Sequence, residues 1–224
     1  MLLGAVIESV TGLRLDRAAE SLVFTPYGLA DTRFGTPVEG RPVAASSPGD
    51  RIERTMIATG VPYPVDGSPD DFAGWRDHPL VGEVNDGNSF HAFGSCAGHA
   101  GLFTSLGDLL RFGRVILQSL AGSGPISRRT ADIFVTAGDD PGQALGWRIW
   151  QTPAGPAIGH TGFPGVGFAV LPDADAVLAM ITNRLHTDGT PVGLEDLWQT
   201  ALHGMIEAVT ATSSTPTEPT EGPR

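Results

Sequence analysis

The region between residues 144 and 184 constrains the fold most, because its apolar residues repeat as they do in strands. Four β-type runs follow one another there: ALGWRIW, PAIGHTG, VGFAVLP and DAVLAMITNR. The last two runs are separated by residues 172–175, whose sequence PDAD is typical of a hairpin turn. A helix is predicted over about residues 193–209, with one apolar face made of Leu194, Leu197, Trp198, Ala201, Leu202, Met205 and Ile206. This helix would cover one face of a sheet.

The rest of the chain is predicted to be helical or irregular. A first helix has the apolar residues Leu2, Leu3, Val6, Ile7 and Val10, no capping residue ahead of them, and Gly12 at its end. A second short helix is expected over residues 15–24, stopped by Thr25-Pro26. Residues 35–90 are rich in Pro, Gly and Asp, and we expect them to be mostly irregular.

Two further helices are predicted between the irregular region and the strands. Ser105 and Asp108 form a pattern like a capping box, with Asp in place of Glu. They would open a helix whose apolar face is Leu106, Leu109, Leu110, Val115, Ile116, Leu117 and Leu120. A shorter helix should run from Ser127 through Ile133. Residues 1–210 therefore form the expected domain, and residues 211–224 a polar, Pro-rich, disordered tail.

Composition excludes several classes of function. A formal charge of −11, without clustered basic residues, argues against binding nucleic acid. The single cysteine, Cys96, excludes an internal disulfide framework and any cysteine-based zinc site. The 14 basic residues are all arginine, and without lysine the chain can hold no P-loop lysine, Schiff base or Ser-x-x-Lys pair.

Localisation stays open at this stage, because the sequence carries no clear targeting signal. It has no run long and apolar enough to span a membrane, and its first residues lack the features of a signal peptide. As written the chain would be cytoplasmic. We expect no cofactor and no metal.

The stretch GHTGFPGVGF, residues 159–168, is the strongest candidate for a site. Polar His160 and Thr161 interrupt an apolar strand and Gly162 follows, and glycine in a strand often marks a close approach of a ligand or another backbone. A backbone N–H here could serve as an oxyanion donor, and His160 could exchange protons near neutral pH. A purely structural role is the alternative that these residues alone leave open.

Weaker candidates lie elsewhere. His91, His99 and Asp86 could share a metal, although loop histidines bonded to the backbone are the more ordinary interpretation. Cys96 with His99 could form a thiol nucleophile, but a small buried thiol is the simpler interpretation. The carboxylate pairs Asp70-Asp71, Asp139-Asp140 and Asp173/Asp175 fit solvated loops.

Four blocks, in order, resemble the serine β-lactamase and penicillin-binding-protein-like family, which includes class C β-lactamases, DD-peptidases and esterases. They are LGAVIESVTG, VFTPYGLADTRF, GEVNDGNSFHAFGSCAGHAGLFTSLGDLLRFG and GHTGFPGVGFAVLPDADAVLAMITNR. The resemblance implies an α+β fold of the β-lactamase/transpeptidase type and serine acyl-transfer chemistry. It also implies that His160, Thr161 and Gly162 line the substrate site as the K/H-T/S-G motif. The Phe163 backbone N–H would be one oxyanion donor.

Two other motifs of that family are missing from these residues. No Ser-x-x-Lys is possible without lysine, and neither Tyr27 nor Tyr63 is followed by Asn two positions later. We therefore expect the C-terminal portion of a larger, truncated hydrolase, inactive alone and in need of an N-terminal segment. Its substrate would be a small acyl or peptide-like molecule. An unpaired sheet edge and uncovered apolar helix faces should result. The alternative is a non-catalytic binding protein that keeps the substrate wall.

Overall fold

An antiparallel sheet of five strands is the centre of the computed structural model, which describes residues 1–61 and 64–213. The strands lie in sequence order, each hydrogen-bonded to the next. They are β3 (Gln143–Ala144), β4 (Trp147–Thr152), β5 (Gly155–Gly162), β6 (Val166–Leu171) and β7 (Ala176–Ile181). The four predicted runs are confirmed as strands, except that the first divides into β3 and β4 at Gly146, which has a φ of 80°. The turn after β6 is a short 3-10 helix, η3 (Pro172–Ala174).

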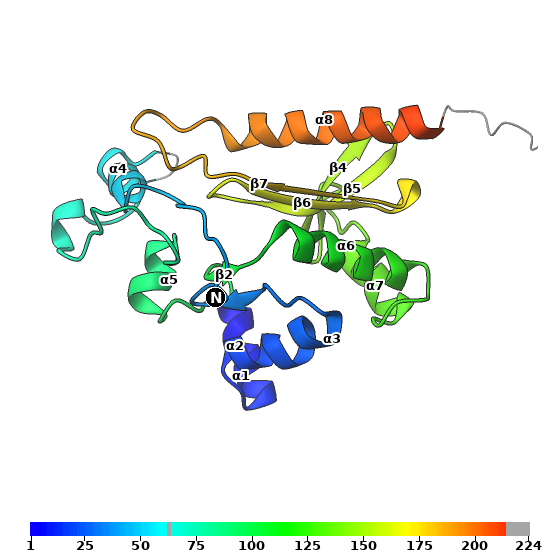
Figure 1. Cartoon of the computed structure of the whole chain (residues 1–224), viewed down its shortest axis with the longest axis horizontal. Helices are drawn as coiled ribbons and strands as arrows, with labels where there is room; N and C mark the ends of the chain where they lie inside the picture. Colours follow the sequence, from blue (N-terminus) through cyan, green and yellow to red (C-terminus); the bar gives the residue numbers. More distant parts are fainter. Residues whose placement is uncertain (62–63, 214–224) are drawn as a thin grey trace, which may run out of the picture.

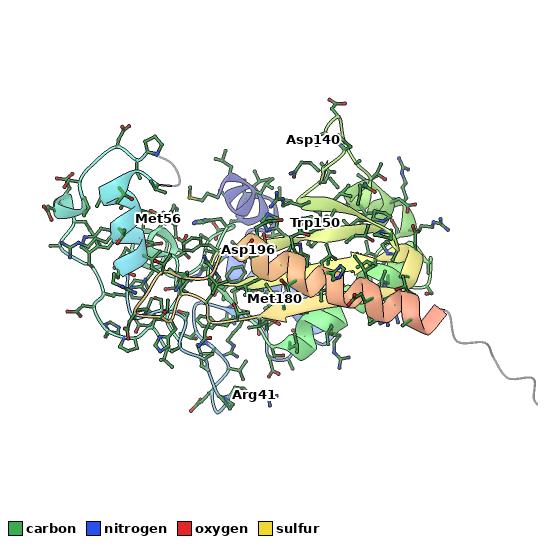
Figure 2. All side chains as sticks on the ribbon, turned by 90° about the horizontal axis from the view of Figure 1, so that it is seen from above. Arg41, Met56, Asp140, Trp150, Met180 and Asp196 are labelled. Carbon is green, nitrogen blue, oxygen red and sulfur yellow. The ribbon has the colours of Figure 1, made fainter. Side chains whose placement is uncertain are left out.

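Helices cover both faces of this sheet. Helix α8 (Leu194–Ser213) lies along one face, and α6 (Leu106–Leu120) and α7 (Arg128–Val135) lie on the other (Figure 1). Ile116, Leu117 and Phe168 belong to the core under α6, and Trp198 and Leu202 to the core under α8. Figure 2 shows Trp150 and Met180 beside α8, where they pack against the second core. The apolar pattern of the sequence therefore predicts both layers.

Two glycines let helices approach the sheet closely. A Cβ on Gly167 would collide with the ring of Trp198, and one on Gly113 would collide with Val177. Both positions must therefore stay without a side chain for α8 and α6 to pack at this distance.

The prediction that Thr25-Pro26 ends the second helix is wrong, because the helix continues to Tyr27. The chain runs without interruption through α2 (Leu15–Ala19), the π-helix η1 (Glu20–Phe24) and α3 (Thr25–Tyr27). Pro26 lacks a backbone N–H, yet the helix continues through it. The helix closes with a Schellman-type cap, in which Leu29 N–H donates to Phe24 O at 2.8 Å and Gly28 N–H donates to Thr25 O at 3.2 Å. Gly28, with a φ of 69°, then ends the helix.

Residues 35–90 are more regular than predicted. They contain α4 (Arg51–Thr59), the 3-10 turn η2 (Pro69–Asp71) and the start of α5 (Gly87–Ala92). Ahead of them β1 (Arg33–Phe34) pairs with β2 (Leu102–Phe103). The prediction missed α4 because its short apolar set, Ile52, Met56 and Ile57, is flanked on both sides by residues rich in Pro, Gly and Asp. We call residues 45–92 the ion-pair region, since the buried pair Asp50–Arg76 lies within it.

The predicted capping box at the start of α6 is confirmed for Ser105 but not for Asp108. Ser105 Oγ accepts the backbone N–H of Asp108 at 3.2 Å, as predicted. The Asp108 carboxylate instead accepts the Asp31 N–H and the Thr32 hydroxyl, at 2.8 and 2.7 Å. Asp108 therefore holds a distant loop onto the helix start. Leu106 and Leu110, predicted on the apolar face, are 48% and 39% exposed.

The ends of the chain follow the predictions in part. The first helix, α1 (Leu2–Thr11), ends at Gly12 as predicted, and α7 begins after its cap Ser127. Helix α8 continues to Ser213, past the predicted end near residue 209. The predicted tail falls mostly on residues 214–224, outside the described residues.

Apolar side chains are exposed on α1. Leu2, Leu3 and Val10 are 85%, 78% and 80% exposed. Within the described ranges, β7 pairs only with β6, so its outer edge carries no strand. None of the helices in those ranges is both long and apolar enough to span a membrane.

Candidate functional site

His160, Thr161 and Gly162 form the last three residues of β5, at the end of the strand next to the β5–β6 turn. His160 lies opposite Phe168 on β6, and Gly162 opposite Val166. His160 is exposed, although the residues that precede it on the strand are buried. The strand thus carries these residues from the core to the surface.

The imidazole of His160 has a defined orientation. Its Nδ1 lies 2.6 Å from the carbonyl oxygen of Thr161, and because a carbonyl only accepts, Nδ1 carries the proton. In the neutral ring Nε2 is then the free acceptor. His160 can therefore take up or deliver a proton through Nε2.

Residues 162–165 form a tight turn, which we call the site turn. Gly165 N–H donates to Gly162 O at 2.9 Å and closes it. Gly165 has a φ of 107°, and a Cβ there would collide with Thr182 Oγ1. Only glycine fits this position. In the described part of the chain, no acceptor is found for the Phe163 N–H.

Arg184 and Thr182 contact the site turn from the end of β7. Arg184 Nη1 donates to Phe163 O at 2.7 Å, and its guanidinium carbon lies 5.6 Å from the centre of the Phe163 ring. Thr182 donates to Gly165 O through both its N–H and its hydroxyl, each at 2.9 Å. Burial lowers the pKa of Arg184 from its usual value, although a guanidinium stays charged at neutral pH. These two residues end the run DAVLAMITNR, and nothing in the sequence pattern indicates a role for them.

A groove of about 450 Å³ borders the site turn. Pro164, Val166 and Ile181 line it on the side of the sheet, and residues 37–38, 41–46 and 102–105 line it on the other side. Most of its named wall residues are apolar. The site turn is therefore the rim of a larger apolar groove.

The metal hypothesis for His91, His99 and Asp86 is wrong. His99 Nε2 lies 3.2 Å from Asp86, but His91 Nε2 lies 3.5 Å from a different carboxylate, Asp50. No group of three possible ligands is present in residues 1–61 and 64–213.

The thiol hypothesis for Cys96 is also unsupported. Burial raises the pKa of the Cys96 thiol, which disfavours the reactive thiolate. His99 bonds to Asp86 and packs its ring against Phe93. Cys96 is therefore best described as a half-buried structural thiol.

Comparison with known proteins identifies the family. The Beta-lactamase family model matches residues 1–202. The chain belongs to the β-lactamase family. Among curated proteins, a relative from Escherichia coli (strain K12) named D-alanyl-D-alanine carboxypeptidase is 30% identical over 207 residues, which cover 84% of this chain and 44% of the relative. An N-acetylmuramyl-L-alanine amidase from Bacillus subtilis (strain 168) is 30% identical over 204 residues, covering 84% of this chain and 43% of that protein.

Two solved structures share the fold of this chain. A penicillin-binding protein from Bacillus halodurans matches with a TM-score of 0.51 and 16% identity, over 91% of this chain and 53% of the other. A D-amino acid amidase from Ochrobactrum anthropi SV3, complexed with D-phenylalanine, matches with a TM-score of 0.55 and 16% identity, over 92% and 56%. The predicted α+β fold of β-lactamase type is thus confirmed. The chain spans less than half the length of the curated relatives it matches.

Proposed function

We propose that this chain is the C-terminal part of a serine acyl hydrolase and supplies the substrate-binding wall of its active site. One observation supports the proposal in particular. In this chain of the β-lactamase family, β5 ends in His160-Thr161-Gly162, and the turn that follows has a backbone N–H, that of Phe163, for which no acceptor is found among the described residues. His160, Thr161 and Gly162 form that wall. The nucleophile belongs to a segment outside these 224 residues, because the chain contains no lysine for a Ser-x-x-Lys pair.

The chemistry is acyl transfer through a covalent intermediate. A serine of the other segment attacks the substrate carbonyl, and the carbonyl oxygen takes up negative charge as the tetrahedral intermediate forms. The Phe163 N–H donates to that oxygen, together with the N–H of the nucleophile. The serine hydroxyl proton passes to a base of the site and from it to the leaving group, which departs as the carbonyl re-forms. Water then attacks the acyl-enzyme and releases the acid and the free serine. His160 takes part in these proton transfers through Nε2.

The substrate is a small acyl or peptide-like molecule: an ester, an amide or a β-lactam. Relatives named as a carboxypeptidase and an amidase support amide substrates in particular. Among the described residues β4 pairs with β5 only as far as Gly159, so the edge of Thr161–Phe163 on that side has no strand partner and can accept a peptide-like substrate edge-on, as strands do.

The test begins with the DNA directly upstream of the Met1 codon. We expect an in-frame or once-frameshifted Ser-x-x-Lys followed by Tyr-x-Asn. The joined protein should hydrolyse p-nitrophenyl acetate or nitrocefin, and His160→Ala should lower its kcat by about 100-fold or more, in line with general acid–base catalysis. His203→Ala, an exposed histidine on α8, is the matched control and should leave the rate unchanged.

The other outcome favours a binding protein. If no such motifs lie upstream and the purified chain is monomeric, folds cooperatively and binds a peptide-like acyl ligand without hydrolysis, the catalytic proposal fails.

A further inference from the structure

Every carbonyl of the site turn except that of Pro164 is held by a hydrogen bond. Gly162 O accepts from Gly165 N–H, Phe163 O accepts from Arg184, and Gly165 O accepts from Thr182. Burial does not require these three bonds, because the turn lies at the surface and Phe163 is 44% exposed. Water could donate hydrogen bonds to these exposed carbonyls equally well. We therefore infer that the protein bonds serve to fix the orientation of the peptide units in the turn.

The peptide unit between Gly162 and Phe163 carries the proposed oxyanion donor. In a trans peptide the C=O and N–H point in opposite directions. Bonding of Gly162 O to Gly165 N–H, inside the turn, therefore directs the Phe163 N–H away from the turn. Thr182 holds Gly165 in position through the Gly165 carbonyl. Arg184 holds the peptide unit between Phe163 and Pro164 through the Phe163 carbonyl.

Arg184 is itself fixed in place. Its Nε donates to Val192 O at 2.7 Å while Nη1 donates to Phe163 O at 2.7 Å. A planar guanidinium can make two such bonds in fixed directions, which the single ammonium of lysine cannot. None of the ion pairs found among the described residues includes Arg184, so its charge is available to the backbone dipole of the turn.

We propose that Arg184 is a positioning residue that, with Thr182, holds the site turn so that the Phe163 N–H faces the substrate oxygen. The inference rests on the proposed function for its catalytic consequence. The role of Arg184 in holding the turn can be tested without any catalytic activity. Arg184 acts through the backbone of Phe163 and does not touch the reacting atoms.

The first test is amide hydrogen exchange on the 224-residue chain, measured by NMR. Arg184→Ala should accelerate exchange of the Gly165 N–H by about 10-fold or more, since one hydrogen bond of the turn depends on this geometry. Arg184→Lys should give an intermediate value. Arg148→Ala, an exposed arginine on β4, is the control and should leave Gly165 unchanged. Unchanged exchange in Arg184→Ala, with the sheet amides intact, overturns the proposal.

The second test uses the joined protein. Arg184→Ala should lower kcat by about 10- to 100-fold with KM nearly constant, because a displaced donor weakens binding of the transition state and not of the substrate. A rise in KM at constant kcat overturns the positioning role. If the joined protein has no activity, the proposed function fails, and the exchange experiment still decides the role of Arg184 in the turn.

Discussion

The sheet and the ion-pair region differ in what holds them together, although Leu80 and Val84 in the ion-pair region are also buried. Both apolar core clusters lie against the faces of the sheet, and none of their members comes from residues 45–92. In the ion-pair region the Arg76 guanidinium instead bonds both oxygens of Asp50 and the carbonyls of Val84 and Asn85. Its guanidinium carbon also lies 4.0 Å from the centre of the Phe90 ring. The side chains of Arg76 and Asp50 are 5% and 1% exposed.

The stability of the sheet is therefore distributed over many contacts, whereas that of the ion-pair region is concentrated in one pair of residues. Burial of many apolar side chains adds up over the sheet, so no single contact decides whether it forms. A buried ion pair concentrates the stability in two groups, and removing either one leaves a buried charge without its partner. We therefore expect the sheet to lose stability globally and the ion-pair region to fail locally.

Loss of the central tryptophan should have the largest effect. Trp198 is fully buried between α8 and the sheet, and Trp198→Ala should lower the free energy of unfolding by about 3–5 kcal/mol. Urea denaturation followed by circular dichroism measures this. The neighbouring exposed position provides the control, Gln199→Ala, for which we expect a change below about 0.5 kcal/mol. Equal effects of the two changes would show that α8 contributes little to the core.

Breaking the buried ion pair should cost about 3 kcal/mol, but only in its own region. Asp50→Ala leaves the Arg76 guanidinium buried without a carboxylate. Hydrogen exchange should show loss of protection in α4 and α5 while β5 and β6 stay protected. The exposed pair Arg54–Asp70 serves as the control, and Arg54→Ala should cost less than about 1 kcal/mol. A loss of protection that spreads equally over the sheet would contradict the comparison.

These two regions also explain how much the sequence could predict. The strands 147–181, α6 and α8 were predictable because apolar spacing is a local signal that directly reports which face is buried. The Asp50–Arg76 pair was not, since two charged residues 26 positions apart have no periodicity that links them. Arg184 was missed for the same reason, because its partner is a backbone carbonyl 21 residues away. His160 was selected as a candidate because polar residues interrupt an apolar strand, and its role in the site is a proposal.

The smallest effect concerns pH. Burial raises the pKa of Glu53 above its ordinary value of 4.5, with the charges of Asp86 and Asp50 acting in the same direction. Below that ordinary value the carboxyl is protonated in both states, and stability falls as the pH rises through the higher pKa of the folded state. For Asp50, burial alone would raise the pKa, but the bonds and charge of Arg76 outweigh it and the pKa is lowered. Its contribution is therefore lost as the pH falls.

The variant Glu53→Gln tests whether the charge of Glu53 lowers the stability of the folded chain. The amide oxygen can still accept the Gly87 N–H, which now bonds the carboxylate at 2.9 Å. The variant should be more stable than the original chain at pH 7, by roughly 1 kcal/mol or less, and the difference should vanish near pH 4. Urea unfolding at both pH values measures it, with Glu195→Gln on α8 as an exposed control. A variant less stable at pH 7 would show that the charge of Glu53 is favourable.

Covalent labelling of the purified 224-residue chain tests the central claim most directly. We propose that this chain forms the wall of an acyl-transfer site and that the nucleophile belongs to another segment. Incubation with a fluorophosphonate or with penicillin, followed by intact-protein mass spectrometry, should show no acyl or phosphonyl adduct on this chain. A stoichiometric adduct on one of its own serines, lost in His160→Ala, would contradict the account.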